Sequence, residues 1–269
     1  MIKLTDLENF ILKAAGRKKL NHDEGRIFGL TNETIKKAVV CWMPNGDAIE
    51  FAAEIGADAI ICHESLFYPY DAPQVVYGEV PKDYLSWSAN AKRLNLLVKH
   101  DIGVYRIHVN MDRISNCDAL VNLLKLGKLV HRDLEKLHYI VEFPPQTLDK
   151  LASQIKARLN MKQLWTVGPR DKKVRRAGMI FGGGGLFTNV FWAEEFISMG
   201  CDVLVCGESD EYAMEYFKDA GAGAGAIVTS HRLSENPGVE QFANSLSKRF
   251  KGHLKLQYFA GALPNQTHE

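Results

Sequence analysis

The sequence predicts an α/β fold made of two similar lobes with mixed sheets, and three observations carry this prediction. Short runs of β-branched and apolar residues alternate with segments whose apolar residues recur every three or four positions. A ten-residue pattern in the first half of the chain returns in the second half. Histidines and carboxylates follow the predicted strands in both halves. Strands that alternate with helices are typical of a largely parallel or mixed sheet with helices packed against it.

The individual elements are read from hydrophobic spacing. Five segments have the apolar spacing of an amphipathic helix, namely residues 7–15, 47–55, 147–159, 189–199 and 239–250. Seven β-rich runs lie between them: KAVVCW, ADAIIC, VYRIHV, HYIVEF, AGMIF, CDVLVC and GAIVTS. Together they predict strands and helices in alternation along the whole chain.

The repeated pattern is GADAIICHES at residues 56–65 and GCDVLVCGES at residues 200–209. Both copies read Gly-x-Asp, a hydrophobic strand, and then Cys-x-Glu-Ser. A helix precedes each copy, and before that helix comes a strand that ends in a glycine-containing turn. A β-like run that ends in a histidine follows each copy, with a carboxylate four residues after the histidine. The shared order predicts a degenerate internal duplication.

We expect the two lobes to occupy residues 1–130 and 131–269. The charged segment GKLVHRDLEKLH, residues 127–138, is the clearest break in composition and is predicted to connect them. The period exceeds a hundred residues, so it describes two similar lobes and excludes a short-repeat solenoid.

Composition excludes several classes of protein. The chain has 269 residues, of which 46% are hydrophobic, and its formal net charge is +1. So small a net charge supplies no global attraction to nucleic acid or to an anionic membrane. No apolar stretch approaches the roughly 20 residues that span a bilayer, and acidic residues lie where a signal peptide is apolar. We therefore expect a cytoplasmic protein that binds neither membrane nor nucleic acid.

The cysteines predict free thiols. Their number, five, is odd, and no C-x-x-C pair occurs. Cys41, Cys62 and Cys206 each lie inside or at the end of an apolar, strand-like run. We expect them to act as small core residues, and we expect no disulfide framework.

Histidines and carboxylates gather where the predicted strands end. In open α/β sheets, ligands bind outside the carboxyl ends of the strands. Imidazole nitrogens and carboxylate oxygens suit zinc, iron, manganese or nickel, and both lobes supply them, so a pair of metal ions in the cleft between the lobes is predicted. A single H-x-x-x-E is common, and the repetition in both halves carries this prediction. The candidates are His63, Glu64, His108, Asp112, Glu208, His231 and Glu235.

Two further features leave alternatives open. The four glycines at residues 182–185 match neither G-x-G-x-x-G nor a P-loop, so they predict no dinucleotide site. They form either a substrate-facing loop whose amides attract an anion or a tight turn that only glycine can trace. The aromatic residues that follow the His-Glu pair suit either a substrate wall, where they would stack on a base, or packing in the core or at an interface. These are Phe67, Tyr68 and Tyr70.

Five motifs, taken in order, resemble those of the Nif-three-like family, whose members are often labelled GTP cyclohydrolase type-two homologues. The motifs are IICHESLF, HVNMD, GGGG, DVLVCGE and SHRLSE, and the resemblance covers nearly the whole chain from Gly29 onward. It implies a two-lobed α/β fold and a dinuclear metal site in the cleft between the lobes. It also implies a ring-shaped homo-oligomer, commonly a hexamer.

The resemblance also assigns residues. It implies five metal ligands, which are His63, Glu64, Asp112, His231 and Glu235. His108 matches the first histidine of a His-Thr-Asn-Leu-Asp-like segment, which implies a residue that orients a ligand or donates to substrate. The chain departs from the family in two places. It has Glu64 where the family has a second histidine, and the GES segment offers Glu211 and Glu215 without a histidine.

The presence of Glu64 in place of histidine has chemical consequences. A carboxylate adds a negative charge and an oxygen donor that binds one metal or bridges two. The site is thereby biased toward manganese, iron(II) or magnesium relative to zinc. Alternatively, Glu64 does not coordinate and acts as a general base beside a single ion. We favour coordination.

Two functions fit these residues. The first is a metal-dependent hydrolase that acts on a small nucleotide-like or phosphorylated substrate, with a metal-activated water as nucleophile. Glu208 or His108 would then move protons. The second is a non-catalytic role as a metal-holding oligomeric scaffold, a metallochaperone or a regulator. An acid/base residue outside the set of metal ligands would favour the hydrolase over the non-catalytic role. Glu208 is the candidate for such a residue. Its position in the repeat matches that of Glu64, so a structural role is the alternative.

Overall fold

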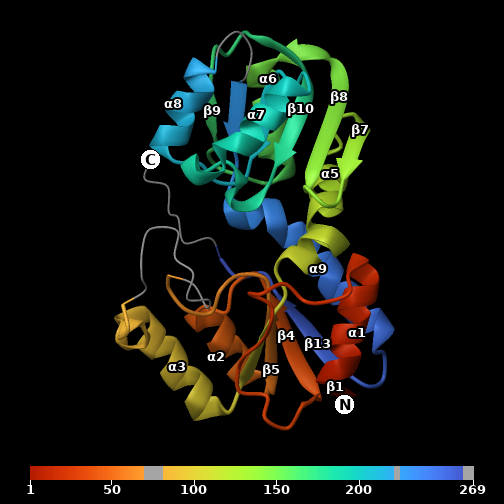
Figure 1. Cartoon of the computed structure of the whole chain (residues 1–269), viewed down its shortest axis with the longest axis vertical. Helices are drawn as coiled ribbons and strands as arrows, with labels where there is room; N and C mark the ends of the chain where they lie inside the picture. Colours follow the sequence, from red (N-terminus) through yellow and green to blue (C-terminus); the bar gives the residue numbers. More distant parts are fainter. Residues whose placement is uncertain (70–80, 221–224, 263–269) are drawn as a thin grey trace. The chain divides into compact units, whose positions relative to one another are not determined.

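The computed structural model describes residues 1–69, 81–220 and 225–262, and the chain divides into two compact units (Figure 1). Unit 1 consists of Met1–Ser115 and the described chain from Gly238 onward, and unit 2 consists of Asn116–Pro237. Each unit has a mixed sheet with helices packed on both of its faces. The predicted α/β fold with mixed sheets is confirmed.

Unit 1 is built on a five-stranded sheet in the order β13-β4-β5-β6-β2. All neighbours in it are parallel except β2, which pairs antiparallel with β6. The strands of this sheet are β2 (Gly25–Phe28), β4 (Lys37–Cys41), β5 (Ala59–Cys62), β6 (Gly103–Arg106) and β13 (Lys255–Phe259), and β1 (Ile2–Lys3) pairs with β3 (Thr34–Ile35) in a separate two-stranded sheet. The helices of unit 1 are α1 (Leu4–Ala15), α2 (Gly46–Glu54), α3 (Ser88–His100) and α4 (Val109–Met111).

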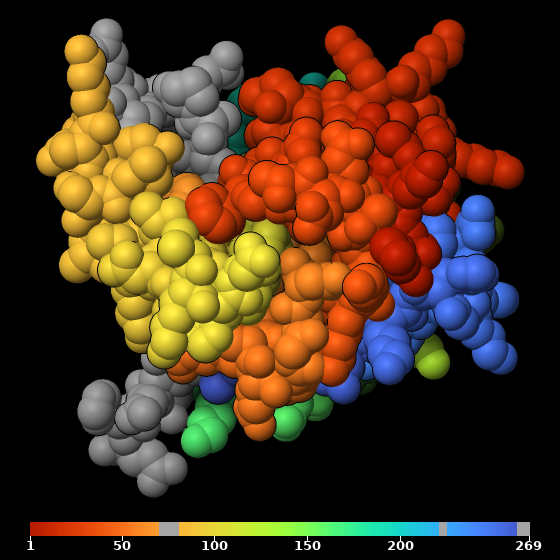
Figure 2. Space-filling view, turned by 90° about the horizontal axis from the view of Figure 1, so that it is seen from below, coloured from red at the N-terminus to blue at the C-terminus, as the bar shows by residue number. Residues whose placement is uncertain are grey.

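Successive residues along the strands of unit 1 point to opposite faces of the sheet, and different helices pack on the two faces. Val40 packs with Leu7 of α1 and with Phe242 of α9 (His231–Arg249), which begins in unit 2 and continues into unit 1. Val39, the next residue along β4, packs with Ile49 of α2 on the opposite face. Figure 2 shows the red N-terminal residues beside the blue C-terminal part of this unit. A period of two along a fully buried strand therefore builds two apolar layers.

Unit 2 is built on a six-stranded sheet in the order β7-β8-β10-β11-β12-β9. Its three central strands, β10, β11 and β12, are parallel, and the flanking pairs are antiparallel. Its strands are β7 (Lys128–Asp133), β8 (His138–Thr147), β9 (Trp165–Val167), β10 (Lys173–Ile180), β11 (Val203–Cys206) and β12 (Gly225–Val228). Its helices are α5 (Cys117–Leu124), α6 (Leu148–Arg158), α7 (Val190–Ser198) and α8 (Glu211–Asp219).

Both faces of this sheet are also covered. Val205 packs with Leu151 of α6, whereas its neighbour Leu204 packs with Phe196 of α7 and Phe217 of α8. The five residues named here are all at most 1% exposed. Burial on both faces explains why the parallel strands read as continuous apolar runs in the sequence.

The same order of elements occurs in both units. In unit 1 it is β4, α2, β5, α3, β6, and in unit 2 it is β10, α7, β11, α8, β12. The carboxyl ends of the strands align, with Cys41 opposite Cys62 and Cys62 opposite Arg106 in unit 1. In unit 2, Ile180 lies opposite Cys206. The internal duplication stays a prediction, but the order of elements on which it was based is present.

The units differ in extent from the lobes predicted at residues 1–130 and 131–269. The last described part of the chain belongs to unit 1 because β13 pairs in parallel with β4. Residues 127–138 do not form a connector: they contain β7, the edge strand beside β8. The alternation of exposed and half-buried residues along β7 suits an edge strand, and its charged side chains are the source of the composition break.

The structure bears on the cysteines and on membrane spans, two features for which the composition gave expectations. The five cysteines are free thiols, and all of them are buried, as the sequence predicts. Within the part of the chain that the structure describes, no helix combines the length and the apolar character needed to cross a bilayer.

Candidate metal centre

His63 and Glu64 come directly after β5, at the carboxyl edge of the sheet of unit 1. Their backbone amides donate to the Trp42 carbonyl oxygen at 3.1 and 2.7 Å, and this fixes the exit of the strand. Nδ1 of His63 lies 3.3 Å from the carbonyl oxygen of Ile107. A proton on Nδ1 donates to that oxygen and leaves Nε2 with the lone pair that a metal requires.

His108 and Asp112 lie one helical turn apart after β6. The Asp112 amide donates to the His108 carbonyl oxygen at 3.1 Å, so the H-x-x-x-D spacing spans the short helix α4. Asp112 begins a π-helical turn, η2 (Asp112–Asn116), and turns of this kind are frequent at functional sites. Its Oδ1 lies 3.5 Å from Nε2 of His63. The two predicted ligands are therefore neighbours.

The ligand atoms of His63, Glu64 and His108 lie within 4.8 Å of one another. Nε2 of His63 is 3.9 Å from Oε1 of Glu64, and the two imidazole ring centroids are 4.9 Å apart. Metal–nitrogen and metal–oxygen bonds of roughly 2 Å place the ligand atoms of one ion a few ångströms apart. Unit 1 thus contains a group that can hold a divalent metal ion, and His108, which the resemblance implies as an orienting residue, belongs to it.

Arg106 contacts two of the candidate ligands and was not predicted from the sequence. It ends β6, and its side chain is 3% exposed. Its Nε donates to the His63 carbonyl oxygen at 3.0 Å, and its Nη1 lies 3.2 Å from Oδ2 of Asp23. Its Nη2 lies 3.7 Å from Oε2 of Glu64. One planar guanidinium group therefore connects two candidate ligands to the loop before β2.

Asp23 and Glu24, which lie in the loop before β2, both contact His108, and neither was predicted from the sequence. Oδ2 of Asp23 lies 2.8 Å from Nδ1 of His108 and so leaves Nε2 of this histidine as the ligand atom. Oε1 of Glu24 accepts the backbone amides of His108 and Asn110, each at 2.8 Å. The ring and the backbone of His108 are both fixed by carboxylates.

The contact between Asp23 and His108 shifts the pKa of each residue. Burial favours the neutral carboxyl of Asp23, but its hydrogen bond to His108 and the charges of His108 and Arg106 hold its pKa far below the usual range. Burial likewise opposes the charged form of His108, yet the Asp23 hydrogen bond and the Glu64 carboxylate raise its pKa overall. Asp23 therefore remains an ionised acceptor for the Nδ1 proton.

In unit 2, His231 and Glu235 lie on the first turn of α9. Nε2 of His231 is 3.4 Å from Oε2 of Glu235, and its Nδ1 is 2.8 Å from Oε2 of Glu208. Glu208 comes from the end of β11, so two separate elements bring these side chains together. The Glu235 side chain is 4% exposed, whereas that of Glu208 is 48% exposed. One carboxylate is buried against the histidine, and the other is open to solvent.

The glycine run lies against this group. Gly182 has a φ of 57°, and a side chain there would overlap the Glu235 carboxylate. A Cβ on Gly207 would lie 2.5 Å from the Gly182 nitrogen and 2.7 Å from Oγ of Ser234. The interpretation as a turn that only glycine can trace is confirmed at Gly182. The turn also borders His231, since a Cβ on Gly182 would lie 3.3 Å from its Nε2.

The aromatic residues after the His-Glu pair have different roles. Phe67 is 7% exposed and packs in the core of unit 1, which confirms core packing for this residue. Tyr68 is 42% exposed, and the guanidinium carbon of Arg93 lies 4.6 Å from its ring centroid. Tyr70 lies outside the described residues.

Known proteins resemble this chain along nearly its full length. A family model described as Duf34/NIF3 (NGG1p interacting factor 3) matches residues 3–264. A "GTP cyclohydrolase 1 type 2 homolog" from Escherichia coli (strain K12) is 27% identical over 223 residues, covering 80% of this chain and 81% of the relative. A relative of the same name from Clostridium perfringens (strain 13 / Type A) is 22% identical over 266 residues, with 95% of each chain covered.

Two solved structures share the fold. A hypothetical protein of Staphylococcus aureus superposes with a TM-score of 0.76 at 16% identity and covers 99% of both chains. A Bacillus cereus protein related to NIF3 gives a TM-score of 0.76 at 13% identity, again over 99% of both chains. At such low identity these structures show that the fold is shared, and any function must be argued from the side chains of this chain.

Proposed function

The chain belongs to the DUF34/NIF3 family, and we propose that it binds a pair of divalent metal ions and hydrolyses a small nucleotide-like or phosphorylated substrate. One observation carries the proposal: in each unit, histidines and carboxylates converge where parallel strands end. Unit 1 supplies the group of His63, Glu64 and His108. Unit 2 supplies His231 between Glu208 and Glu235.

The donor atoms decide which ions fit. Every candidate ligand offers an imidazole nitrogen or a carboxylate oxygen, which suits zinc, iron, manganese or nickel. Such ions, when bound, polarise a phosphoryl or carbonyl oxygen and lower the pKa of water. The proposed ligands are His63, Glu64, Asp112, His231 and Glu235.

Glu64 has its own test. Metal content of the Glu64→Ala variant, purified without chelator, is compared with that of the unaltered protein. We expect a loss of metal, because the Glu64 carboxylate lies beside His63. An unchanged content would remove Glu64 from the ligand set and favour its alternative role as a general base.

Glu208 is the proposed acid/base residue. Its carboxylate is 48% exposed while Oε2 contacts Nδ1 of His231, so one carboxylate group meets both solvent and the histidine. A group in this position can take up a proton at its carboxylate and can orient the His231 ring. His108, with Nδ1 held by Asp23, is the second candidate for proton transfer.

The surface beside Glu208 suits a flat ring. Phe187 and Tyr212 are 52% and 76% exposed, and their ring centroids lie 5.6 Å apart. The Phe187 amide donates to Oδ2 of Asp210 at 2.8 Å, which ties the aromatic pair to the segment that carries Glu208. Stacking of a base on an aromatic side chain is worth about 1–3 kcal/mol. This pair supports a heterocyclic substrate.

Turnover assays test the enzymatic role. The metal-loaded protein is screened against nucleotides and phosphoesters, and then the Glu208→Gln variant is assayed on any substrate found. We expect Glu208→Gln to lose turnover by about 10²–10⁴-fold when it is assayed at metal concentrations that saturate the variant, since Glu208 also contacts the proposed ligand His231. The matched control is Glu211→Gln, which changes an exposed carboxylate on α8 and leaves turnover intact. Absence of turnover with every common metal would favour the alternative, a scaffold, metallochaperone or regulator.

The sequence predicts that the ions share one cleft, and this stays a prediction with a spectroscopic test. Protein loaded with manganese(II) is examined by electron paramagnetic resonance. Ions a few ångströms apart, as in two-metal sites, give a spin-coupled spectrum. The signal of isolated manganese would contradict a dinuclear centre while leaving metal binding in place.

Self-association is part of the proposal. The family resemblance implies a homohexamer, and unit 2 carries exposed aromatic side chains that an oligomer would cover. Trp165 and Phe191 are 61% and 53% exposed. Light scattering coupled to gel filtration is expected to give the mass of a hexamer, and a monomer over the accessible concentrations would contradict it.

A further inference from the structure

Two buried side chains of α3 hold an exposed tyrosine in unit 1. Oδ1 of Asn90 accepts the Tyr68 amide at 2.8 Å, and its Nδ2 donates to the Tyr68 carbonyl oxygen at 2.7 Å. The guanidinium carbon of Arg93 lies 4.6 Å from the centroid of the Tyr68 ring, and its Nη2 donates to the Tyr68 hydroxyl oxygen at 3.1 Å. Asn90 and Arg93 are 0% and 5% exposed, whereas Tyr68 is 42% exposed. The backbone, the ring and the hydroxyl of Tyr68 are therefore all fixed from α3.

Tyr68 lies at the same edge of the sheet as His63 and Glu64. Its hydroxyl is 3.9 Å from the sulfur of Met43. Met43 follows Trp42, whose carbonyl oxygen accepts the backbone amides of His63 and Glu64. Ligands of open α/β sheets bind at this carboxyl edge. An aromatic residue that is held there can contact the same substrate as the candidate metal ligands.

The positive charge of Arg93 faces no carboxylate among the residues that the structure describes. Its Nη1 donates to the Leu66 carbonyl oxygen, and its Nη2 contacts the Tyr68 hydroxyl and the Met43 sulfur. None of the ion pairs between arginines and carboxylates in that part of the chain includes Arg93. Buried charges are normally paired, because an isolated charge is costly away from water. A negatively charged ligand close to Arg93 would offset this cost.

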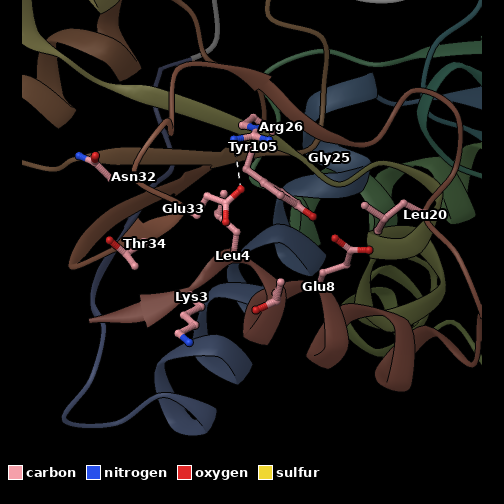
Figure 3. Close-up of a pocket in the computed structure, with 11 residues that line it drawn as sticks. Lys3, Leu4, Glu8, Leu20, Gly25, Arg26, Asn32, Glu33, Thr34 and Tyr105 are labelled. Atoms are coloured by element: carbon pink, nitrogen blue, oxygen red, sulfur yellow. Dashed lines mark ion pairs between the residues drawn. The ribbon is translucent and has the colours of Figure 1, made fainter.

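Two other arginines of unit 1 have their charge offset. Arg106, which is also buried, lies against the carboxylates of Asp23 and Glu64. Arg26 lines a cavity of about 470 Å³ beside α1 and β2, where its Nη1 lies 4.0 Å from Glu33 (Figure 3). The Arg26 side chain is 46% exposed, so water also screens its charge. Arg93 differs from both, because it is buried and its neighbours in the described chain are uncharged.

The hydroxyl of Tyr68 connects this buried charge to the surface. Its oxygen accepts a hydrogen bond from Arg93, so its proton is left to be donated, and it points to the Met43 sulfur, a weak acceptor. An anionic oxygen is a far stronger acceptor, and the hydrogen bond from Arg93 polarises the hydroxyl that would donate to it. We propose that the Tyr68 hydroxyl binds an anionic phosphoryl oxygen of the substrate, and that Arg93 and Asn90 position it. The identity of the ligand as a substrate rests on the proposed function.

Titration with inorganic phosphate, followed by phosphorus NMR, tests the contact on the full chain. Metal is removed with a chelator, and the chelator is then dialysed away, so that neither contributes to binding. We expect phosphate to bind, and Tyr68→Phe to weaken this binding roughly tenfold, because the variant keeps the ring on Arg93 and loses the hydroxyl. Trimethyl phosphate has the same phosphoryl oxygen without the charge and is expected not to bind.

The matched control is Tyr216→Phe in unit 2. It removes a hydroxyl that contacts the carboxylate of Glu194, beside which an anion would be repelled, and it should leave the affinity for phosphate unchanged. No binding of phosphate to the unaltered protein, or unchanged affinity in a folded Tyr68→Phe variant, would overturn the proposal. Equal binding of trimethyl phosphate, or an equal loss in Tyr216→Phe, would also overturn it.

Two substitutions of Arg93 test its positioning role. Arg93→Met removes the charge and should weaken phosphate binding about as much as Tyr68→Phe. Arg93→Lys keeps the charge, although it lacks the planar fork, and should restore part of the affinity. A purely structural role would lower the stability of both variants without this difference in phosphate affinity. Equal affinities in the two folded variants would therefore remove Arg93 from the site.

Turnover separates this proposal from the proposed hydrolysis. A protein that binds phosphate through Tyr68 but hydrolyses no phosphoester would contradict the hydrolase and leave the contact in place. If a phosphoester substrate is found, its KM should rise in Tyr68→Phe. A KM that is unchanged in this variant would contradict the contact and leave the hydrolase in place.

Discussion

The two units present the same order of parallel strands but support their candidate ligands by different means. In unit 1 the support is charged: Arg106 contacts Glu64 and Asp23, and Asp23 in turn holds His108. In unit 2 the exposed carboxylate of Glu208 contacts His231, and the backbone of the glycine turn at Gly182 is packed directly against Glu235 and His231. Unit 1 should therefore be sensitive to the loss of a charge, and unit 2 to an added methyl group.

The largest effect is expected for Arg106→Met. The substitution keeps an apolar stem but removes the cation that Asp23 and Glu64 face in a buried setting. Breaking a buried ion pair in this way costs about 3–5 kcal/mol. The free energy of unfolding in urea measures the loss.

The matched control for Arg106 is Arg132→Met in unit 2. Arg132 pairs with Asp118 at 2.6 Å, but the two side chains are 42% and 31% exposed. Exposed pairs contribute about 0–1 kcal/mol, so this variant should be nearly neutral. Equal losses in the two variants would show that unit 1 is not supported by charge.

Gly207→Ala tests the backbone support of unit 2. The added Cβ meets the Gly182 backbone, which cannot move as a side chain can, and we expect a loss of about 1–3 kcal/mol. Gly46→Ala is the control, since its Cβ would meet only the end of the Lys92 side chain at 3.4 Å. That variant should be neutral or more stable by up to about 1 kcal/mol. Calorimetric unfolding that ranks the two variants in the opposite order would refute tight packing at Gly207.

Asp23→Asn separates orientation from stability. The amide still reaches His108 but carries no charge, and loss of such an outer partner weakens metal binding by about 10–100-fold. Zinc or manganese affinity is measured by competition with a chelating dye. Asp171→Asn, an exposed site in unit 2, is the control. An affinity that stays within twofold of the unaltered protein would contradict the positioning role of Asp23.

The smallest effect concerns His138, a buried histidine whose carboxylate partner, Glu195, is 40% exposed. His138 is 3% exposed in unit 2, and burial lowers its pKa despite Glu195 at 3.3 Å, whereas the pKa of His108 is raised. The unfolded chain binds a proton near pH 6.5 and the folded chain only at lower pH. The unfolded state therefore holds more protons in that window, and stability falls as pH drops from about 6.5 toward the folded pKa.

The contribution of His138 to the pH dependence of stability has an upper limit, and another histidine serves as the control. One proton limits the slope to about 1.4 kcal/mol per pH unit. Urea unfolding at several pH values should show a flatter profile for His138→Phe. His253→Gln, an exposed histidine, should leave the profile unchanged. A stability that rises on acidification through this window would reverse the assigned sign.

The sequence predicted the central elements well because their strands are buried on both faces. It missed α3, whose buried face includes Asn90 and Arg93, so apolar spacing is interrupted there. It missed α8 because only Ala213 and Phe217 of that helix are buried. The assignment of the chain end to unit 1 depends on the pairing of β13 with β4, which joins residues far apart in the sequence and leaves no local signal.

The candidate ligands could be predicted because each follows a strand end or lies one helical turn from another. The partners that hold them could not. Asp23 lies 85 residues before His108, and no short motif joins them. One signal was present in the sequence. Arg106 lies two residues before His108 in the apolar, strand-like run VYRIHV, and a buried arginine requires a carboxylate nearby.

Metal content is the most direct test of the central claim that both units supply metal ligands. The full chain is purified without chelator, and divalent metal is measured per chain by elemental analysis. We expect bound metal in the unaltered protein, a loss in both His63→Ala and His231→Ala, and no change in His253→Ala. A protein that takes up no divalent metal, or one whose content survives both ligand substitutions, would contradict the account.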